Sequence, residues 1–431
     1  MAEQLWVFRE FDGDYQNTGC ITSRQNEAVF AYSSEYLQLE EAQSISLSLP
    51  LRLDPYSPKE TSTFFEGLLP EGDMRRSLEW ALHAGPGAFS VLLARLNNES
   101  AGALVFSTGS PSDESELIKN RSYTAFSSED LQLFSNNPGR VALETGMASR
   151  LSIAGAQTKL GLYKEDDKSA DSWFLPLGSA PSTHIIKASD GRFQYLTINE
   201  ALCLATARHL GFAVAESFLI PVTDAEPLLA VRRFDRIMRD DSPTIDGHSI
   251  PRRLHQEDVC QAAGLPLMYK YEPTDGNYLG FTARLINQHA ENPFADRMML
   301  FNRVLFDFII GNCDNHLKNH SFLWNESWST RELSPLYDIT CTTFYPNLDK
   351  EMGVSLCASR RIDKVTADDI LLSAIRVGIG EKLAWEQYIS LSEDFMQSLA
   401  KAEEELLEQG FKEAVVVADF IRVDAEGRLS L

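Results

Sequence analysis

Nine consecutive residues of this chain, 311–319, carry an unusual number of side chains that can take part in chemistry. They read GNCDNHLKN and follow the apolar run at 304–310. A second apolar run follows at 321–324. A turn after a helix, capped by Asn and Asp, is the purely structural alternative for such a stretch. One acid, one histidine, one lysine and three amides exceed what a turn requires, so we expect this loop to face a cleft.

The acid and the last amide of this loop have a spacing that is typical of phosphoryl transfer. Asp314 and Asn319 stand five positions apart, as in the D-x-x-x-x-N catalytic loop of protein kinases. There the aspartate accepts the proton of the attacking hydroxyl, and the asparagine holds a magnesium ion. We therefore predict Asp314 as the catalytic base and Asn319 as a metal ligand. His316, between them, is expected to brace the loop by hydrogen bonds.

A second metal-binding acid is expected soon after this loop. Asp338 ends a short apolar segment, 333–338, which we predict to be a strand. Oxygen ligands from carboxylates and amides suit Mg²⁺, so Asp338 and Asn319 form the predicted metal site. Alone, a terminal Asp is more often a helix N-cap, and that alternative stays open.

A loop that could cover the phosphates of a nucleotide is predicted at 152–159, where small residues flank a glycine. A plain β-hairpin turn is the alternative. The residues of this loop that we expect to contact the nucleotide are Ser152, Ala154, Gly155, Ala156, Gln157 and Lys159.

Lys187 ends the apolar strand 184–187, as the phosphate-binding lysine of kinases does. A lysine closing a strand can also be simply solvated. Glu200 on the next predicted helix, 197–210, could pair with it, or could complete a capping box with Thr197. Phe234, in a segment placed like a kinase hinge, is a candidate contact for the adenine ring, although a core position is the alternative.

Composition limits the class of protein. The chain has 431 residues, a net charge of −23 and six cysteines without a CxxC pair. So acidic a surface disfavours unaided binding to nucleic acid. The scattered cysteines argue against a disulfide framework and for a reducing compartment. Neither a membrane-spanning apolar stretch nor a signal-peptide pattern is found, so we expect a cytoplasmic protein.

The order of predicted elements gives a fold class, α+β, with a bilobal, protein-kinase-like arrangement. We expect a β-rich amino-terminal subdomain at 1–110, with a strand at 44–49, and a surface connection at 111–149 that carries a short helix at 127–134. A β-rich lobe with the phosphate loop and the lysine is expected at 150–253. A helical lobe with the catalytic loop and the metal site is expected at 254–431. Its predicted helices are 256–263, 278–288, 294–311, 366–377, 383–389 and 393–408.

Nine segments, taken together and in order, resemble the HipA family of bacterial serine/threonine kinases, the toxins of type II toxin–antitoxin pairs. The resemblance covers nearly the whole chain. The segments are SLSLPL (46–51), FFEGLLPEG (64–72), AGAL (101–104), SIAGAQTKLGL (152–162), THIIK (183–187), LLAVRRFDR (228–236), RLHQEDVCQAAG (253–264), GNCDNHLKNHSF (311–322) and LSPLYDI (333–339).

The resemblance implies an ATP- and Mg²⁺-dependent protein kinase acting on an aminoacyl-tRNA synthetase, such as glutamyl-tRNA synthetase, with growth arrest and persistence as the result. By position, Asp314 matches the base, Asn319 and Asp338 the metal ligands, and Lys187 the phosphate-binding lysine. Ser152 matches the serine whose autophosphorylation silences the kinase. The implied partner is a small helix-turn-helix antitoxin of the HipB type, through which DNA is bound indirectly.

Two other functions stay open at this point. One is a catalytically inert HipA-like corepressor that only binds the antitoxin. The other is a small-molecule or lipid kinase with the same catalytic layout. Family members often carry Glu where this chain has Arg232, which would reverse the charge of any nucleotide contact made there.

Overall fold

The computed structural model describes the chain except for a few short stretches; the described residues are 3–24, 27–85, 88–96, 100–109, 115–118, 121–149, 157–165, 172–189, 191–356, 358 and 360–431. The chain divides into two compact units. Unit 1 comprises Met1–Ala188, Ile220–Leu267 and Leu323–Ser329, and unit 2 comprises Ser189–Leu219, Met268–Phe322 and Thr330–Leu431.

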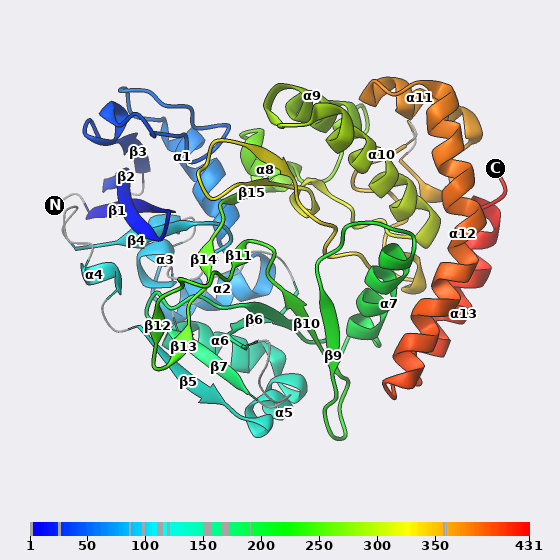
Figure 1. Ribbon diagram of the computed structural model, residues 1–431, viewed down its shortest axis with the longest axis horizontal. Coiled ribbons are helices and arrows are strands. Elements are labelled where there is room, and N and C mark those ends of the chain that lie inside the picture. Colours follow the sequence, from blue (N-terminus) through cyan, green and yellow to red (C-terminus); the bar gives the residue numbers. More distant parts are fainter. Residues whose placement is uncertain are drawn as a thin grey trace. The chain divides into compact units, whose positions relative to one another are not determined.

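Unit 1 begins with an antiparallel four-stranded sheet in the order β3-β2-β1-β4 (Figure 1). Its strands are β1 (Glu3–Phe11), β2 (Asp14–Arg24), β3 (Glu27–Tyr32) and β4 (Leu104–Ser107). Three helices lie between β3 and β4 in the sequence, namely α1 (Pro58–Phe65), α2 (Gly72–Ala81) and α3 (Phe89–Leu96). A capping box of Ser57 and Glu60, with Pro58 in the first turn, fixes the start of α1.

A second sheet of unit 1 has β8 (His184–Lys187) between β6 (Lys159–Leu162) and β10 (Leu228–Arg232), all antiparallel. Strand β5 (Ser122–Phe126) pairs with β7 (Trp173–Leu177). Helices α4 (Ser115–Ile118), α5 (Ser128–Asn136) and α6 (Pro138–Ser149) precede β6. The rest of unit 1 contains β11 (Arg236–Ile237), β12 (Thr244–Ile245), β13 (His248–Ser249), β14 (Arg252–Arg253), β15 (Gln256–Asp258) and α8 (Val259–Ala262).

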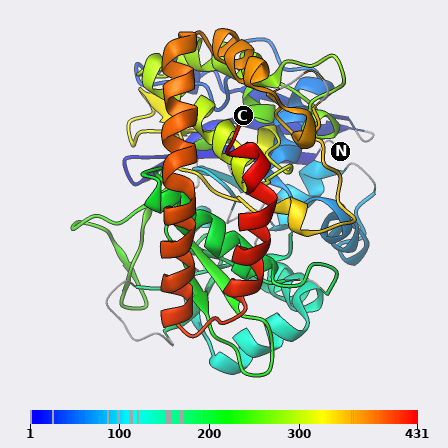
Figure 2. The same ribbon diagram turned by 90° about the vertical axis from the view of Figure 1, so that its right-hand side faces the viewer.

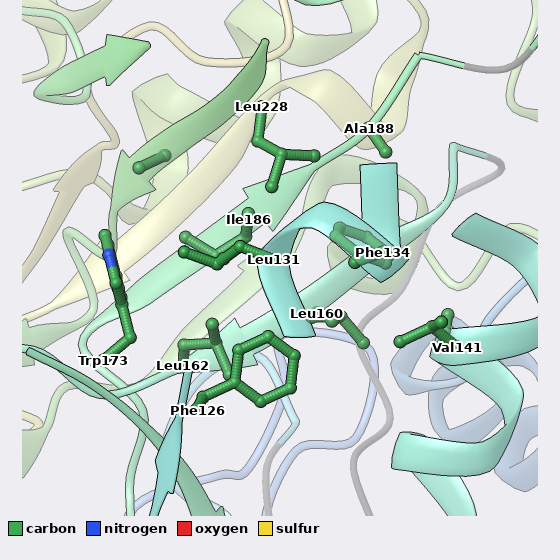
Figure 3. Close-up of a cluster of buried hydrophobic side chains, with 12 residues drawn as sticks. Phe126, Leu131, Phe134, Val141, Leu160, Leu162, Trp173, Ile186, Ala188 and Leu228 are labelled. Atoms are coloured by element: carbon green, nitrogen blue, oxygen red, sulfur yellow. The ribbon is translucent and has the colours of Figure 1, made fainter. Parts of the chain in front are cut away.

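The part of the chain expected to be a surface connection contributes to the core of unit 1. Figure 3 shows Phe126, Leu131, Phe134 and Val141 among side chains from the second sheet, such as Leu160. All of these side chains are buried. The predicted short helix at 127–134 is confirmed as α5, but the Ser- and Asn-rich composition around it hid the apolar side chains that anchor β5, α5 and α6.

The prediction of a strand at 44–49 is wrong. Polar and apolar residues do alternate in this segment, but its backbone hydrogen-bonds to side chains and not to another strand. Tyr32 accepts a hydrogen bond from the Ile45 N–H and donates one to the Leu49 carbonyl. Glu257, buried in β15, accepts hydrogen bonds from the Leu47 N–H and the Ser46 hydroxyl. Two segments with no assigned chemistry, SLSLPL and RLHQED, therefore hold each other in place.

Unit 2 is mainly helical. Its helices are α7 (Leu196–His209), α9 (Tyr278–His289), α10 (Pro293–Ile310), α11 (Ala367–Val377), α12 (Glu381–Glu408) and α13 (Ala414–Ala425), and it contains the short strand β17 (Arg331–Leu333). Strands β9 (Ser217–Ile220) and β16 (Ser321–Trp324) lie where the chain passes between units. Helix α12 contacts α7, α11 and α13, and Figure 2 shows α13 running alongside it.

Three helix predictions for the chain need correction. The segments 383–389 and 393–408 form one uninterrupted helix, α12, since neither Gly nor Pro separates them. Residues 256–258 belong to β15, and only 259–262 are helical. Helix α7 begins at Leu196 after Tyr195, which has φ +61°, so Thr197 lies inside it and forms no capping box with Glu200.

Within the ranges that the structure describes, no helix is long and apolar enough to cross a membrane.

Candidate functional site

The loop 311–319 is fastened to the end of helix α10 by its own first residues. Gly311 has φ +86°, a left-handed conformation that glycine adopts without strain and that ends the helix. The Asn312 N–H donates to the Asp307 carbonyl (2.8 Å), and the Asn312 side-chain amide donates to Asp307 Oδ1 (2.7 Å). The Thr342 hydroxyl, from a later segment, accepts from the Cys313 N–H at 2.7 Å. The loop therefore starts from a fixed position.

Hydrogen bonds that are local in sequence then fold the loop around Asp314. Its N–H donates to Asn312 Oδ1 (3.0 Å), and its carbonyl accepts from the His316 N–H (2.9 Å) and from Asn319 Nδ2 (2.8 Å). Of residues 311–320, all of which the structure describes, only Asp314 is exposed. Its side chain has 54% of its surface accessible. The loop is thus built to present one carboxylate.

His316 and Tyr271 flank this carboxylate. His316 Nε2 lies 3.9 Å from Asp314 Oδ1, which is too long for a hydrogen bond. The Tyr271 hydroxyl donates to the same oxygen at 2.5 Å. The rings of His316 and Tyr271 meet edge to face, with centroids 5.0 Å apart. The expected bracing of the loop by hydrogen bonds from His316 stays a prediction. Sequence reasoning did not single out Tyr271.

The layer beneath the loop is polar and buried. Asn315 exchanges two hydrogen bonds with the Val354 backbone (3.0 and 3.1 Å). Burial raises the pKa of Asp307 to about 6, against the opposing effects of Arg303 and of the amides of Asn312 and Asn315. Burial likewise keeps the pKa of His320 well below its usual value, with Arg303 acting in the same direction. His320 is therefore neutral near pH 7.

Asp338 does not end a strand as predicted. Strand β17 stops at Leu333, and Leu336 instead exchanges backbone hydrogen bonds with Ala213 and Ala215. Asp338 itself has φ +53°. Non-glycine residues in this left-handed region cost on the order of 1 kcal/mol and gather at functional sites. A strained backbone therefore sets the position of the second predicted metal ligand.

Asn319 and Asp338 are suited to a hard cation such as Mg²⁺. The Tyr337 hydroxyl donates to the Lys318 carbonyl at 2.9 Å, so neighbours of the two candidate ligands are in direct contact. Because Asn319 donates its Nδ2 to the Asp314 carbonyl, its Oδ1 is the remaining polar atom of that amide. Amide and carboxylate oxygens are the ligands that Mg²⁺ takes, with water completing its shell. Among the described residues, no three His, Cys, Asp or Glu side chains form a metal-binding group.

The predicted nucleotide residues of unit 1 are described in part. Lys187, 3% exposed, stands at the end of β8, opposite Leu229 of β10 and Lys159 of β6. Gln157 donates its side-chain amide to the Ala188 carbonyl at 3.4 Å. Lys187 and Lys159 thus stand opposite each other on neighbouring strands. The predicted residues that lie outside the described ranges are Ser152, Ala154, Gly155 and Ala156.

The charged residues of the hinge-like segment have a structural role. Asp235 binds Arg233 at 2.9 and 2.7 Å and lies 3.0 Å from Arg236 Nη1. It also accepts from the Gly102 N–H at 2.8 Å, and Arg233 donates to the Ser100 carbonyl at 2.8 Å. The side chains of this arginine–aspartate cluster, Arg233, Asp235 and Arg236, are almost completely buried. Phe234, between them, is half-buried, and its contact with a nucleotide stays a prediction.

Comparison with known proteins identifies relatives over most of the chain. A family model described as the HipA-like C-terminal domain matches residues 151–409, and one described as the HipA N-terminal domain matches residues 14–107. A protein of Sinorhizobium fredii named putative kinase Y4mE is 31% identical over 388 residues, which cover 89% of this chain and 88% of that protein. The serine/threonine-protein kinase toxin HipA of Shewanella oneidensis is 28% identical over 309 residues, 69% of this chain and 66% of that protein.

A solved structure shares the fold. The structure of Shewanella oneidensis HipA with HipB and its operator DNA superimposes with a TM-score of 0.78. The match covers 100% of this chain and 96% of that chain at 21% identity. The predicted α+β, kinase-like fold is therefore confirmed.

Proposed function

Since this chain belongs to the HipA family, we propose that it is an ATP- and Mg²⁺-dependent serine/threonine protein kinase that acts as the toxin of a toxin–antitoxin pair. The observation that carries this proposal is the presentation of Asp314. It is the one exposed side chain of a loop, 311–320, that the structure describes completely, and the amide of Asn319 is bonded to its carbonyl. A base that removes a proton from a protein hydroxyl must be accessible in this way.

Each candidate side chain has one task in this proposal. Asp314 accepts the proton of the acceptor hydroxyl, and His316 supports the loop. Lys187, with Lys159 beside it, attracts the phosphates of ATP. Asn319 and Asp338 hold Mg²⁺, which neutralises negative charge on the phosphates when it is bound.

Labelling with [γ-³²P]ATP and Mg²⁺ tests the activity. We expect wild-type protein to incorporate phosphate, and Asp314→Asn to reduce the rate by at least about 100-fold, because a general base contributes that much. Asp394→Asn, an exposed substitution on α12, is the matched control and should retain full activity. Absence of transfer to the protein itself and to proteins of a cell extract would contradict the proposal.

The proposed protein substrate is an aminoacyl-tRNA synthetase, with glutamyl-tRNA synthetase as the first candidate, and Ser152 is the proposed site of self-inactivating phosphorylation. Phosphoproteomics after induced expression tests both sites at once. We expect one dominant phosphorylated synthetase, and loss of the Ser152 phosphopeptide in Ser152→Ala. Phosphorylation spread over many unrelated proteins would argue against the synthetase.

The proposed partner is a helix-turn-helix antitoxin of the HipB type, since the solved structure of similar fold is a complex of HipA with HipB and operator DNA. The net charge of −23 repels phosphate backbones, so we assign DNA binding to the partner and not to this chain.

A further inference from the structure

Tyr271 reaches the proposed base from a segment that no motif identifies. Its hydroxyl donates to Asp314 Oδ1 at 2.5 Å, a short, charge-assisted hydrogen bond. The two residues are 43 positions apart in sequence. With 54% of the Asp314 side chain accessible, packing covers only part of this carboxylate. The hydrogen bond from Tyr271 gives one of its oxygens a defined direction.

Both sequence neighbours of Tyr271 are themselves fixed. On one side, the Lys270 carbonyl accepts from the Leu317 N–H of the catalytic loop at 3.1 Å. On the other side, Glu272 is 3% exposed and accepts from the N–H groups of Tyr278 and Ser355, both at 2.8 Å. A buried carboxylate with two backbone donors is a rigid anchor. The backbone on both sides of Tyr271 is therefore fixed, and its side chain, which is 45% exposed, meets the ring of His316 edge to face.

We propose that Tyr271 is a positioning residue, whose hydroxyl holds the carboxylate of Asp314 in the orientation that receives the proton of the acceptor. This inference rests on the proposed kinase function. During transfer, the acceptor O–H bond breaks and its proton passes to Asp314. The acceptor oxygen forms a bond to the γ-phosphorus of ATP, and ADP leaves. Tyr271 takes no part in bond making and acts through Asp314 alone.

Kinetics of Tyr271→Phe test the role, because this change removes the hydroxyl and keeps the ring against His316. We expect kcat for phosphate incorporation to fall by about 10- to 100-fold, the usual effect of a misplaced reacting group, with KM for ATP unchanged. Tyr123→Phe is the matched control, since it removes a phenol hydroxyl of unit 1 that donates to the Pro181 carbonyl (2.8 Å) and not to Asp314 or to the segment around Tyr271. It should remain close to wild type. Equal activity of wild type and Tyr271→Phe would overturn the proposal.

A double-mutant comparison separates positioning from a general structural effect. In an Asp314→Asn background, Tyr271→Phe should cause no further loss, because the two residues act as one unit. An additional loss as large as in the wild-type background would show that Tyr271 acts elsewhere.

Crystal structures supply a readout that does not depend on activity. We expect one Asp314 side-chain conformer in the wild type and several in Tyr271→Phe. If the wild type transfers no phosphate yet shows this difference, the kinase function fails while the positioning contact stands. An unchanged single conformer in Tyr271→Phe would overturn the positioning role.

Discussion

Asp307 holds the start of the candidate loop in place, although its side chain is buried. It is completely buried, and it binds both the backbone and the side chain of Asn312. Burial raises its pKa to about 6 and lowers the pKa of nearby Arg303. Both shifts are opposite to those that a strong ion pair would produce, so we assign desolvation the larger effect.

The raised pKa of Asp307 predicts a pH dependence of stability. Because its pKa rises from 3.8 when unfolded to about 6 when folded, folding takes up a proton between these values. The free energy of unfolding therefore falls as the pH rises through this window, by about 3 kcal/mol from this group. Asp307→Asn has no titrating group at this position. The free energy of unfolding of this variant, measured with urea, should therefore increase relative to that of the wild type by about 3 kcal/mol as the pH rises from 4 to 7. A stability difference that stays constant with pH would contradict this origin. Asp296, whose pKa burial also raises to about 6, is present in both proteins and cancels.

Sequence alone identified the residues of the site that interact locally. Asp314 and Asn319 have a recognisable spacing because the bond from Asn319 Nδ2 to the Asp314 carbonyl spans just that interval. Tyr271 and Glu272 were missed because their contacts join segments that are distant in the chain. Nothing in the sequence around Tyr269 and Tyr271 indicates that the fold brings one of these tyrosines to a carboxylate.

At the scale of elements, the segment 352–356 packs against the catalytic loop through a glycine. The Gly353 N–H donates to the Cys313 carbonyl at 3.0 Å. A Cβ atom on Gly353 would lie 2.7 Å from the His316 nitrogen and 2.8 Å from its Cα, closer than real side chains approach backbone atoms. The absence of a side chain at this position allows the two segments to touch.

Gly353→Ala should therefore displace the loop. We expect phosphate transfer to fall by about 10-fold or more, because a shift of about 1 Å at a reacting group has at least this effect. Gly380→Ala, at the start of α12, is the control, since an added Cβ there meets no atom within 4 Å. Labelling assays alongside thermal unfolding distinguish a shifted loop from an unfolded protein. Full activity of Gly353→Ala would show that the segments can separate without consequence.

The elements that sequence predicted best are those with a strong local signal. Helix α11 is bounded by a capping box of Thr366 and Asp369 and by Gly378, and its predicted range, 366–377, differs from the observed one by a single residue. The strand at 44–49 failed for the opposite reason. Its alternation is local, but the partners of its backbone, Tyr32 and Glu257, are side chains that only the folded chain brings near.

At the scale of the whole molecule, unit 1 is held together by buried charges from distant parts of the chain. The arginine–aspartate cluster binds the backbone of Ser100 and Gly102. Separately, Glu10 of β1 binds Arg253 of β14 at 3.0 Å, and both side chains are buried. Burial opposes ionisation of Asp235, but Arg233 and Arg236 keep its pKa below the usual range.

Removing one partner of such a cluster should be costly. Asp235→Asn leaves two buried guanidinium groups without their counter-charge, so we expect unit 1 to lose about 3–5 kcal/mol in the free energy of unfolding. Asp73→Asn breaks an ion pair with Arg76 that is largely exposed and should change stability little. Urea unfolding near pH 7 measures both. Similar stability of the two variants would mean that water reaches the cluster.

This cluster has a consequence for genetics. If expression of the protein arrests growth, a selection for surviving cells will recover substitutions at Arg233, Asp235 and Arg236 as readily as at Asp314. Survivors with a substitution in the arginine–aspartate cluster should contain little folded protein, and survivors with a substitution at Asp314 should contain a normal amount. Immunoblots of the survivors would therefore sort inactive alleles into those that lack the protein and those that lack its chemistry.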